Sequence, residues 1–145
     1  MSKVTYDTSV LIAYKPTTFP VGFVMSAVVI QELTAGAVDK SAVQRWDASR
    51  RSHENAGTLL VPNAEDWWLA GKVLNSLLRR LKSEAGGMTP RIQKTDQWRI
   101  VRDVLIARTA KRAGALLVTD NLKDFEKIKS FCNVRLVGGK TYFSP

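Results

Sequence analysis

The chain has 145 residues, enough for one domain with a substantial core and too few for two ordinary ones. Its composition, 45% hydrophobic and 24% charged with no long apolar run, excludes a membrane-spanning protein and indicates a soluble one. The first residues do not resemble a secretory signal, so we expect a cytoplasmic location. The net charge of +9 favours a polyanionic partner such as nucleic acid.

The first half of the chain predicts two strands, with helices beside them. Residues 4–6 form a short buried strand that ends at Asp7, and Thr8 or Ser9 caps a helical turn over 10–12. An extended piece at 23–25 leads to Ser26, which caps a helix that runs to about Gly36. An amphipathic helix within 39–56 precedes a second strand at 58–61.

The second half predicts the same alternation. A helix with a wide apolar stripe covers 64–82, and a loop follows over 84–90. Asp96 or Thr95 caps a long helix over 97–113, which Gly114 ends. A clear apolar strand at 115–119, a short helix at 124–130 and a strand at 134–137 complete the chain. This order predicts one α/β domain over 1–145, a three-layer α/β/α sandwich with a mostly parallel central sheet.

Several acidic residues lie at positions where a lone carboxylate is unfavourable. Asp7 and Asp120 each follow an apolar strand, Glu32 interrupts an apolar helical run, and Asp103 lies on the apolar side of its helix. Taken singly, Asp7 and Asp120 are explained equally well as helix caps, and Glu32 or Asp103 as partners of arginines. The combination favours a common site.

That site is expected at the edge of the sheet where the carboxyl ends of parallel strands meet. Asp7 and Asp120 would be neighbours there, with Asp124 one turn further on, and two helices would direct Glu32 and Asp103 inward. Converging carboxylates repel each other unless a cation neutralises them. Because one histidine, His53, and one cysteine, Cys132, cannot build a zinc site, the oxygen ligands favour Mg²⁺, with Mn²⁺ as the alternative.

The acidic motifs, taken in order, resemble those of the PIN-domain family, in particular VapC-type toxins of toxin–antitoxin pairs. Residues 4–12, VTYDTSVLI, resemble the opening strand with its first aspartate, and residues 26–36, SAVVIQELTAG, the second acidic motif. Residues 103–107 and 115–125 resemble the third and fourth motifs. The resemblance implies a PIN-like α/β/α fold and a Mg²⁺-dependent endoribonuclease in which Asp7, Glu32, Asp103 and either Asp124 or Asp120 are catalytic and bind the metal.

The resemblance also implies a cognate antitoxin that inserts Arg or Lys among the carboxylates, and a homodimer. A lone histidine excludes a two-histidine mechanism, so we expect a metal-activated water and products with 5′-phosphate and 3′-hydroxyl ends. Thr8, Ser9, Thr119 and Asn121 are expected to give polar support. The basic residues on both sides of a Gly-Gly loop are possible RNA contacts: Arg79, Arg80, Lys82, Arg91 and Lys94. That they simply form a solvated helix end is an equal alternative.

Two other protein classes, and a non-enzymatic alternative, share some of these features. Haloacid-dehalogenase-like phosphatases place a second aspartate where this chain has Ser9, and response-regulator receivers lack acids placed like Glu32 and Asp103. The non-enzymatic alternative is a basic RNA-binding or partner-binding module whose carboxylates are structural. Metal dependence would separate that module from a nuclease.

Overall fold

A computed structural model of the protein describes residues 2–87 and 92–145. Five short parallel strands lie at its centre. In one sheet β1 (Lys3–Tyr6) pairs with β4 (Ala115–Thr119), and β4 pairs with β5 (Leu136–Gly138). In the other, β2 (Met25–Ser26) pairs with β3 (Leu59–Leu60). A parallel bridge between Val4 and Phe23 joins the two sheets, which gives the order β3-β2-β1-β4-β5.

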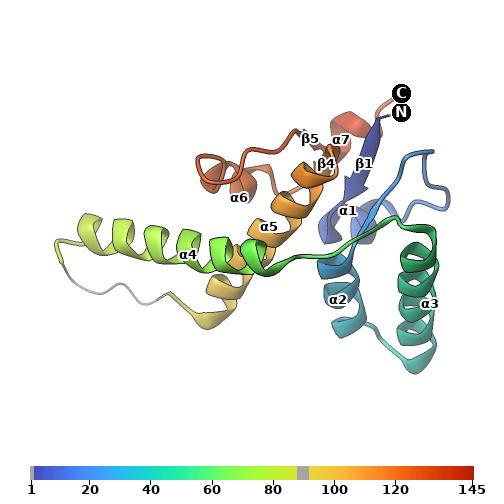
Figure 1. Ribbon diagram of the computed structural model, residues 1–145, viewed down its shortest axis with the longest axis horizontal. Helices are drawn as coiled ribbons and strands as arrows, with labels where there is room; N and C mark the ends of the chain where they lie inside the picture. Colours follow the sequence, from blue (N-terminus) through green and yellow to red (C-terminus); the bar gives the residue numbers. More distant parts are fainter. Residues whose placement is uncertain (1, 88–91) are drawn as a thin grey trace.

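Helices surround this sheet (Figure 1). In chain order they are α1 (Thr8–Tyr14), α2 (Ala27–Ala35), α3 (Lys40–Ala56), α4 (Ala64–Glu84), α5 (Lys94–Arg112), α6 (Leu122–Lys127) and α7 (Gly139–Tyr142). The predicted three-layer α/β/α fold with a parallel sheet is confirmed. In the described part of the chain, no helix is both long and apolar enough to cross a membrane.

The core explains why the apolar runs become these elements. The central strand β4 is almost entirely buried, as expected for a parallel strand covered on both faces, and Leu117 and Val118 are inaccessible. Helix α5 packs against β4 with a continuous buried stretch, residues 104–107. Because each of these side chains is removed from water, burial is the main force that holds α5 on the sheet.

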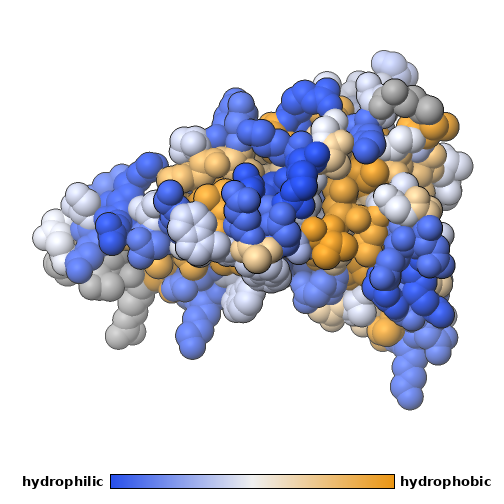
Figure 2. All heavy atoms as spheres, viewed as in Figure 1, coloured by the Kyte–Doolittle hydropathy of each residue, from blue (hydrophilic) through white to orange (hydrophobic). Residues whose placement is uncertain are grey.

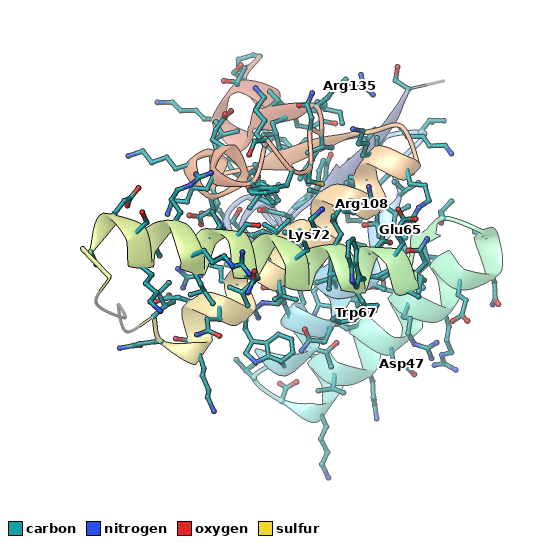
Figure 3. The ribbon with its side chains drawn as sticks, turned by 60° about the vertical axis from the view of Figure 1, so that its left-hand side comes forward. Asp47, Glu65, Trp67, Lys72, Arg108 and Arg135 are labelled. Carbon is teal, nitrogen blue, oxygen red and sulfur yellow. The ribbon has the colours of Figure 1, made fainter. Side chains whose placement is uncertain are left out.

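Helices α4 and α5 form an arm held together by charge as well as by apolar contacts. The carboxylate of Asp66 is fully buried and pairs with Arg112 and with Arg108, the latter at 3.2 Å. Burial alone would raise the pKa of Asp66, but these guanidinium groups and the Asn63 backbone outweigh it and lower the pKa. Figure 3 shows Arg108 also near Glu65 of α4, at 3.7 Å. The buried carboxylate thus ties the first turn of α4 to the last turns of α5.

The structure corrects three helix boundaries and one strand predicted from sequence. Asp7, rather than Thr8 or Ser9, caps α1, since its carboxylate accepts a hydrogen bond from the Val10 amide. Helix α5 begins at Lys94 without a side-chain cap, so the expected caps Thr95 and Asp96 lie inside its first turn. The short helix predicted over 124–130 begins earlier, at Leu122, and the last strand spans 136–138 rather than 134–137.

Other boundaries agree with the prediction. Ser26 caps α2 through the Val29 amide, and Gly114 adopts the left-handed conformation, with φ of 69°, just after α5. The loop predicted over 84–90 is described only to Gly87, so residues 88–90 lie outside the described residues.

Tryptophan side chains on the arm are exposed rather than buried. Trp67 and Trp68 of α4 keep 51% and 65% of their surface accessible, and Trp98 of α5 keeps 58%. Figure 3 shows Trp67 on the outside of α4. In the space-filling view of Figure 2, apolar side chains also gather between this arm and α3, whereas α3 itself is covered by hydrophilic ones. The apolar stripe of α4 is therefore wider than the core it covers.

Candidate functional site

Asp7 sits at the carboxyl end of β1 and is only 4% exposed. Its carboxylate is held from both sides: Ser9 Oγ donates to Oδ1 at 2.5 Å, and Thr119 Oγ1, from the end of β4, donates to Oδ2 at 2.5 Å. Burial raises the pKa of Asp7, although these hydrogen bonds and two backbone amides oppose the change. The structure therefore fixes the orientation of Asp7 before any ligand binds.

Glu32 projects from α2 toward the same edge. Its carboxylate lies 3.6 Å from the guanidinium of Arg102 on α5. Burial and the charge of Asp7 raise the pKa of Glu32, while Arg102 and the approach of the Thr8 hydroxyl lower it. Thr8 Oγ1 is nevertheless buried without a well-formed hydrogen bond, as is Nε of Arg102. Two buried polar atoms near this carboxylate thus lack a hydrogen-bond partner within the described residues.

Asp103 is the most strongly perturbed carboxyl of the site. It is partly buried on α5, and its pKa rises from 3.8 to about 8. Burial is the largest cause, followed by the charges of Asp124, Asp7 and Glu32, while Arg102 opposes the shift. Four carboxyls, from the end of β1, from α2, from α5 and from α6, are therefore coupled electrostatically.

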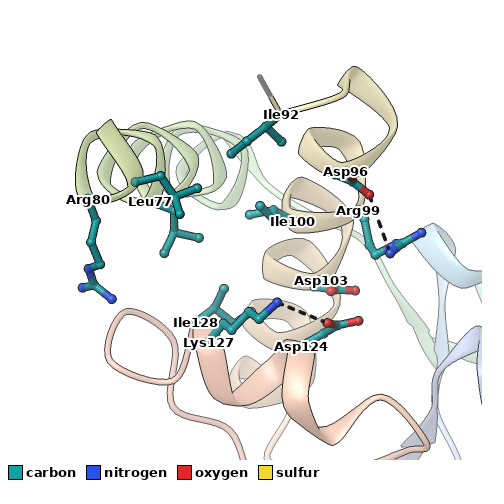
Figure 4. A pocket seen from close by; sticks show the side chains of 11 residues that line it. Leu77, Arg80, Ile92, Asp96, Arg99, Ile100, Asp103, Asp124, Lys127 and Ile128 are labelled. Atoms are coloured by element: carbon teal, nitrogen blue, oxygen red, sulfur yellow. Dashed lines mark ion pairs between the residues drawn. The ribbon is translucent and has the colours of Figure 1, made fainter. Parts of the chain in front are cut away.

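Asp124 lies opposite Asp103, where α6 faces α5 (Figure 4). It also pairs with Lys127 at 3.9 Å. Both acids line one end of a cleft of about 340 Å³ between α4, α5 and α6. Its other walls combine apolar side chains, such as Leu77 and Ile100, with the acid Asp96 and three basic residues: Arg80, Arg99 and Lys127. The cleft can accommodate an anionic chain that leads toward the carboxyls.

Asp120 was the second candidate for the fourth position, and the structure directs it elsewhere. Its side chain is exposed and accepts a hydrogen bond from the Tyr14 hydroxyl at 3.3 Å. Asp120 is not among the charges that raise the pKa of Asp103, whereas Asp124 is the first of them. The expected proximity of Asp120 to Asp7 is indirect, since the Asp120 amide donates to Ser9 Oγ at 3.2 Å.

The residues expected to give polar support differ in what they do. Ser9 and Thr119 hold Asp7, as described above, and Thr119 Oγ1 also accepts from the Asn121 amide at 2.9 Å. Asn121 is the N-cap residue of α6, but its side chain makes no capping hydrogen bond. The hydrogen bond from Tyr14 to Asp120 was not predicted from sequence. The signal for it is weak, since Tyr14 is marked only by its position at the end of the helix that Asp7 caps.

The basic residues expected to contact RNA are also divided by the structure. Arg80 lines the same cleft as Asp103 and Asp124, on its opposite side (Figure 4). Arg79, Lys82 and Lys94 are exposed on the arm, and none of them lines this cleft. Arg91 lies outside the described residues. Arg99, Arg102 and Lys127, which were not selected from sequence, lie at or beside the carboxyls instead.

The side-chain oxygens of the site are candidate ligands for a divalent cation. Within residues 2–87 and 92–145, no three His, Cys, Asp or Glu side chains already form a metal site. The available donors are carboxylate oxygens, and the unpartnered Thr8 hydroxyl lies among them. Coupled carboxyls and a free hydroxyl suit Mg²⁺ or Mn²⁺, which bind oxygen and retain water ligands. The residues present therefore fit such a cation, provided that the carboxyls draw closer around it.

Comparison with known proteins places the fold. No protein-family description and no curated protein sequence matches this chain. Among solved structures it is similar to VapBC-1 from nontypeable Haemophilus influenzae, with 19% identity over 94% of this chain and 98% of the other, and a TM-score of 0.54. It is also similar to DNA-bound VapBC from Salmonella typhimurium, with 21% identity over 96% and 99% of the two chains and a TM-score of 0.53.

A third similar structure is FitAB bound to a DNA fragment, with 16% identity over 94% of both chains and a TM-score of 0.52. Identities this low establish a shared fold rather than a shared activity. The chain thus has a PIN-like α/β/α fold of the kind found in these toxin–antitoxin complexes.

Proposed function

We propose that this protein is a Mg²⁺-dependent endoribonuclease and the toxin of a VapBC-type toxin–antitoxin pair. The observation that carries the proposal is the coupling of four carboxyls, Asp7, Glu32, Asp103 and Asp124, at the carboxyl edge of the sheet. Arg102 pairs with Glu32 and Lys127 with Asp124, but two cations do not neutralise four acids. Site and fold together support a member of the PIN-domain family.

The side chains divide the work of phosphodiester hydrolysis. Asp7, Glu32, Asp103 and Asp124 would hold one or two Mg²⁺ ions. When bound, Mg²⁺ would lower the pKa of the attacking water and stabilise the negative charge that develops on the scissile phosphate. Ser9 and Thr119 keep the Asp7 carboxylate oriented, so the reorganisation that cation binding requires is reduced.

Basic residues at the site balance the charge of the acids. Arg102, which pairs with Glu32 at the edge of the site, would supply a positive charge close to the scissile phosphate. Arg80 and Arg99 line the cleft that leads to Asp103 and would hold the phosphates of the bound strand. The net charge of +9 adds a general attraction for RNA.

The test is cleavage of a mixed cellular RNA pool by the purified chain in Mg²⁺, in EDTA, and by Asp7→Asn in Mg²⁺. Asp47→Asn is the matched control, because Asp47 is an exposed carboxylate on α3 that pairs with Arg50. We expect cleavage by the wild type and Asp47→Asn in Mg²⁺ only, with 5′-phosphate and 3′-hydroxyl ends. Cyclic phosphate ends, or RNA binding without cleavage in Mg²⁺ or Mn²⁺, would refute the proposed mechanism, and the second result would favour a binding module.

The proposal includes two protein contacts. An antitoxin segment that carries Arg or Lys would bind the carboxyls and block the substrate, in keeping with the VapBC complexes that share this fold. A second copy of the chain would cover the exposed tryptophans of the α4–α5 arm. Light scattering of the wild type and of Trp68→Ser tests the dimer: a monomeric wild type would exclude it.

A further inference from the structure

An aromatic pair lies on the side of the carboxyls opposite the basic cleft. The rings of Tyr14, the last residue of α1, and Phe143, just after α7, stack with centroids 4.7 Å apart and planes inclined by 23°. Each residue keeps 36% of its surface accessible, whereas Tyr6, which contacts Phe143 from within the core, keeps 2%. The pair therefore forms the outer layer of an aromatic cluster and presents ring surface to solvent.

The pair is connected to the candidate catalytic carboxylate by consecutive hydrogen bonds. Tyr14 Oη donates to Asp120 Oδ1 at 3.3 Å, the Asp120 amide donates to Ser9 Oγ at 3.2 Å, and Ser9 Oγ donates to Asp7 Oδ1 at 2.5 Å. Tyr14 also follows Asp7 by seven positions, at the other end of α1, which corresponds to a rise of about 10 Å along the helix. Tyr14 thus has a defined position relative to Asp7.

The backbone around the pair is adapted to keep the rings in place. A Cβ atom on Gly139 would lie 2.5 Å from Asp120 Oδ1 and 2.6 Å from Tyr14 Cε2, so only glycine leaves room for both. A hollow of about 420 Å³ runs from Asp120 past Lys123 to Asp124. Its lining, residues 120–124, belongs to the first turn of α6 and the residues just before it.

Three lysines neighbour the aromatic pair in sequence or line the hollow beside Asp120. Lys15 follows Tyr14 directly, Lys140 follows Gly139, and Lys123 lies in the hollow; all three are exposed. Among the described residues, no ion pair joins these lysines to an acid. Exposed rings flanked by unpaired lysines are the combination that binds unpaired nucleotides, since the rings stack on bases and the lysines attract phosphates. A protein partner that binds through apolar contacts would not require this charge.

We propose that Tyr14 and Phe143 form a stacking subsite for one unpaired base of the RNA substrate, next to the scissile phosphate, and that Asp120 is a positioning residue for Tyr14. This inference rests on the proposed function, which supplies the nucleic acid. It explains why Asp120 accepts from Tyr14 instead of joining the other carboxyls. The fold would thereby place a base on one side of the carboxyls and phosphates in the cleft on the other.

Binding is tested with short single-stranded RNAs that carry the fluorescent base 2-aminopurine at one position each, in EDTA so that cleavage does not interfere. We expect quenching at one position with the wild type, and weaker quenching at the same position with Tyr14→Phe, which keeps the ring but loses the hydrogen bond to Asp120. Tyr14→Ala should abolish this quenching and weaken binding about 5- to 100-fold. Val38→Ala trims an exposed apolar side chain between α2 and α3 and should leave the quenching unchanged. Circular dichroism melts verify that each variant is folded. If Tyr14→Ala is unfolded, Phe143→Ala tests the stacking subsite in its place.

Asp120 is tested by cleavage in Mg²⁺. A positioning role predicts that Asp120→Asn, whose amide oxygen still accepts from Tyr14, cleaves within a few-fold of the wild type, while Asp120→Ala shows a raised KM and weaker quenching. A loss of kcat in Asp120→Asn would instead identify a metal ligand and overturn this part. If Tyr14→Ala binds RNA and quenches its fluorescence as the wild type does, the stacking subsite is overturned and the nuclease proposal stands. If quenching is position-specific but no RNA is cleaved, the nuclease proposal is overturned and the subsite stands.

Discussion

Replacing Asp103 with asparagine removes the carboxyl whose ionisation is least favourable in the folded protein. Its folded-state pKa of about 8 lies above the unfolded value of 3.8 because burial and three neighbouring acids oppose its charge. The folded chain therefore retains a proton that the unfolded chain has lost, so the stability of the metal-free wild type falls as pH rises between these two values. Above pH 8 both states are ionised and the effect is complete.

The magnitude follows from the same two pKa values. Between pH 5 and pH 8 the free energy of unfolding should fall by up to about 4 kcal/mol, since each pKa unit corresponds to about 1.4 kcal/mol. Because neighbouring carboxyls share the proton, the measured change should be smaller but of the same sign. His53, whose pKa is lowered by burial, acts in the opposite direction in wild type and variant alike.

The assay is urea unfolding in EDTA at pH 5 and pH 8 for the wild type, Asp103→Asn and Asp47→Asn. We expect Asp103→Asn to be more stable than the wild type at pH 8 and similar to it at pH 5. Mg²⁺ should stabilise the wild type at pH 8 by binding the folded state, and the variant much less. A variant destabilised equally at both pH values, or a wild type that gains stability toward pH 8, would refute the argument that repelling carboxyls carry the site.

Three further predictions concern single positions. Asp124→Asn should lower kcat for RNA cleavage by at least about 100-fold, because it removes an electrostatic contact to the reacting centre, and an unchanged rate would remove it from the site. Asp66→Ala should lower the free energy of unfolding by about 3 kcal/mol in urea, since it leaves Arg108 and Arg112 without their buried partner. In thermal melts Gly139→Ala should lower the stability of the protein by about 1–3 kcal/mol, because the new Cβ atom would crowd Asp120 and Tyr14. Gly71→Ala, with nothing within 4 Å of its new Cβ atom, should raise the stability by about 1 kcal/mol. Equal effects of the two substitutions would contradict the crowding at Gly139.

Most of the fold could be predicted from local sequence because its elements have strong signals. The apolar run at 115–119 forms the central strand, and Ser26 caps α2. The errors fall where a local signal competed with another. Thr95 and Asp96 are typical cap residues, but α5 begins at Lys94, after the extended Gln93, because lysine is itself a good helix former. The short helix α7 was not predicted, since four residues carry little periodicity.

The amino-acid sequence by itself determined the order of the acids and the strand ends and helices that carry them. Spacing along the chain places Asp7 after β1 and Glu32 within α2, and parallel strands bring such ends to one edge. Sequence also determined the excess of positive charge, which depends on composition alone.

Only the tertiary structure distinguishes the surroundings of Asp120 and Asp124, which are four residues apart in sequence. Both follow β4, but one turn of α6 directs Asp124 toward Asp103, while Gly139 and Tyr14, distant in sequence, hold Asp120 on the other side. The exposure of the α4 tryptophans was likewise decided by how much of that helix α5 covers. Helical periodicity specifies which side chains share a face, but what that face meets depends on contacts between segments far apart in the chain.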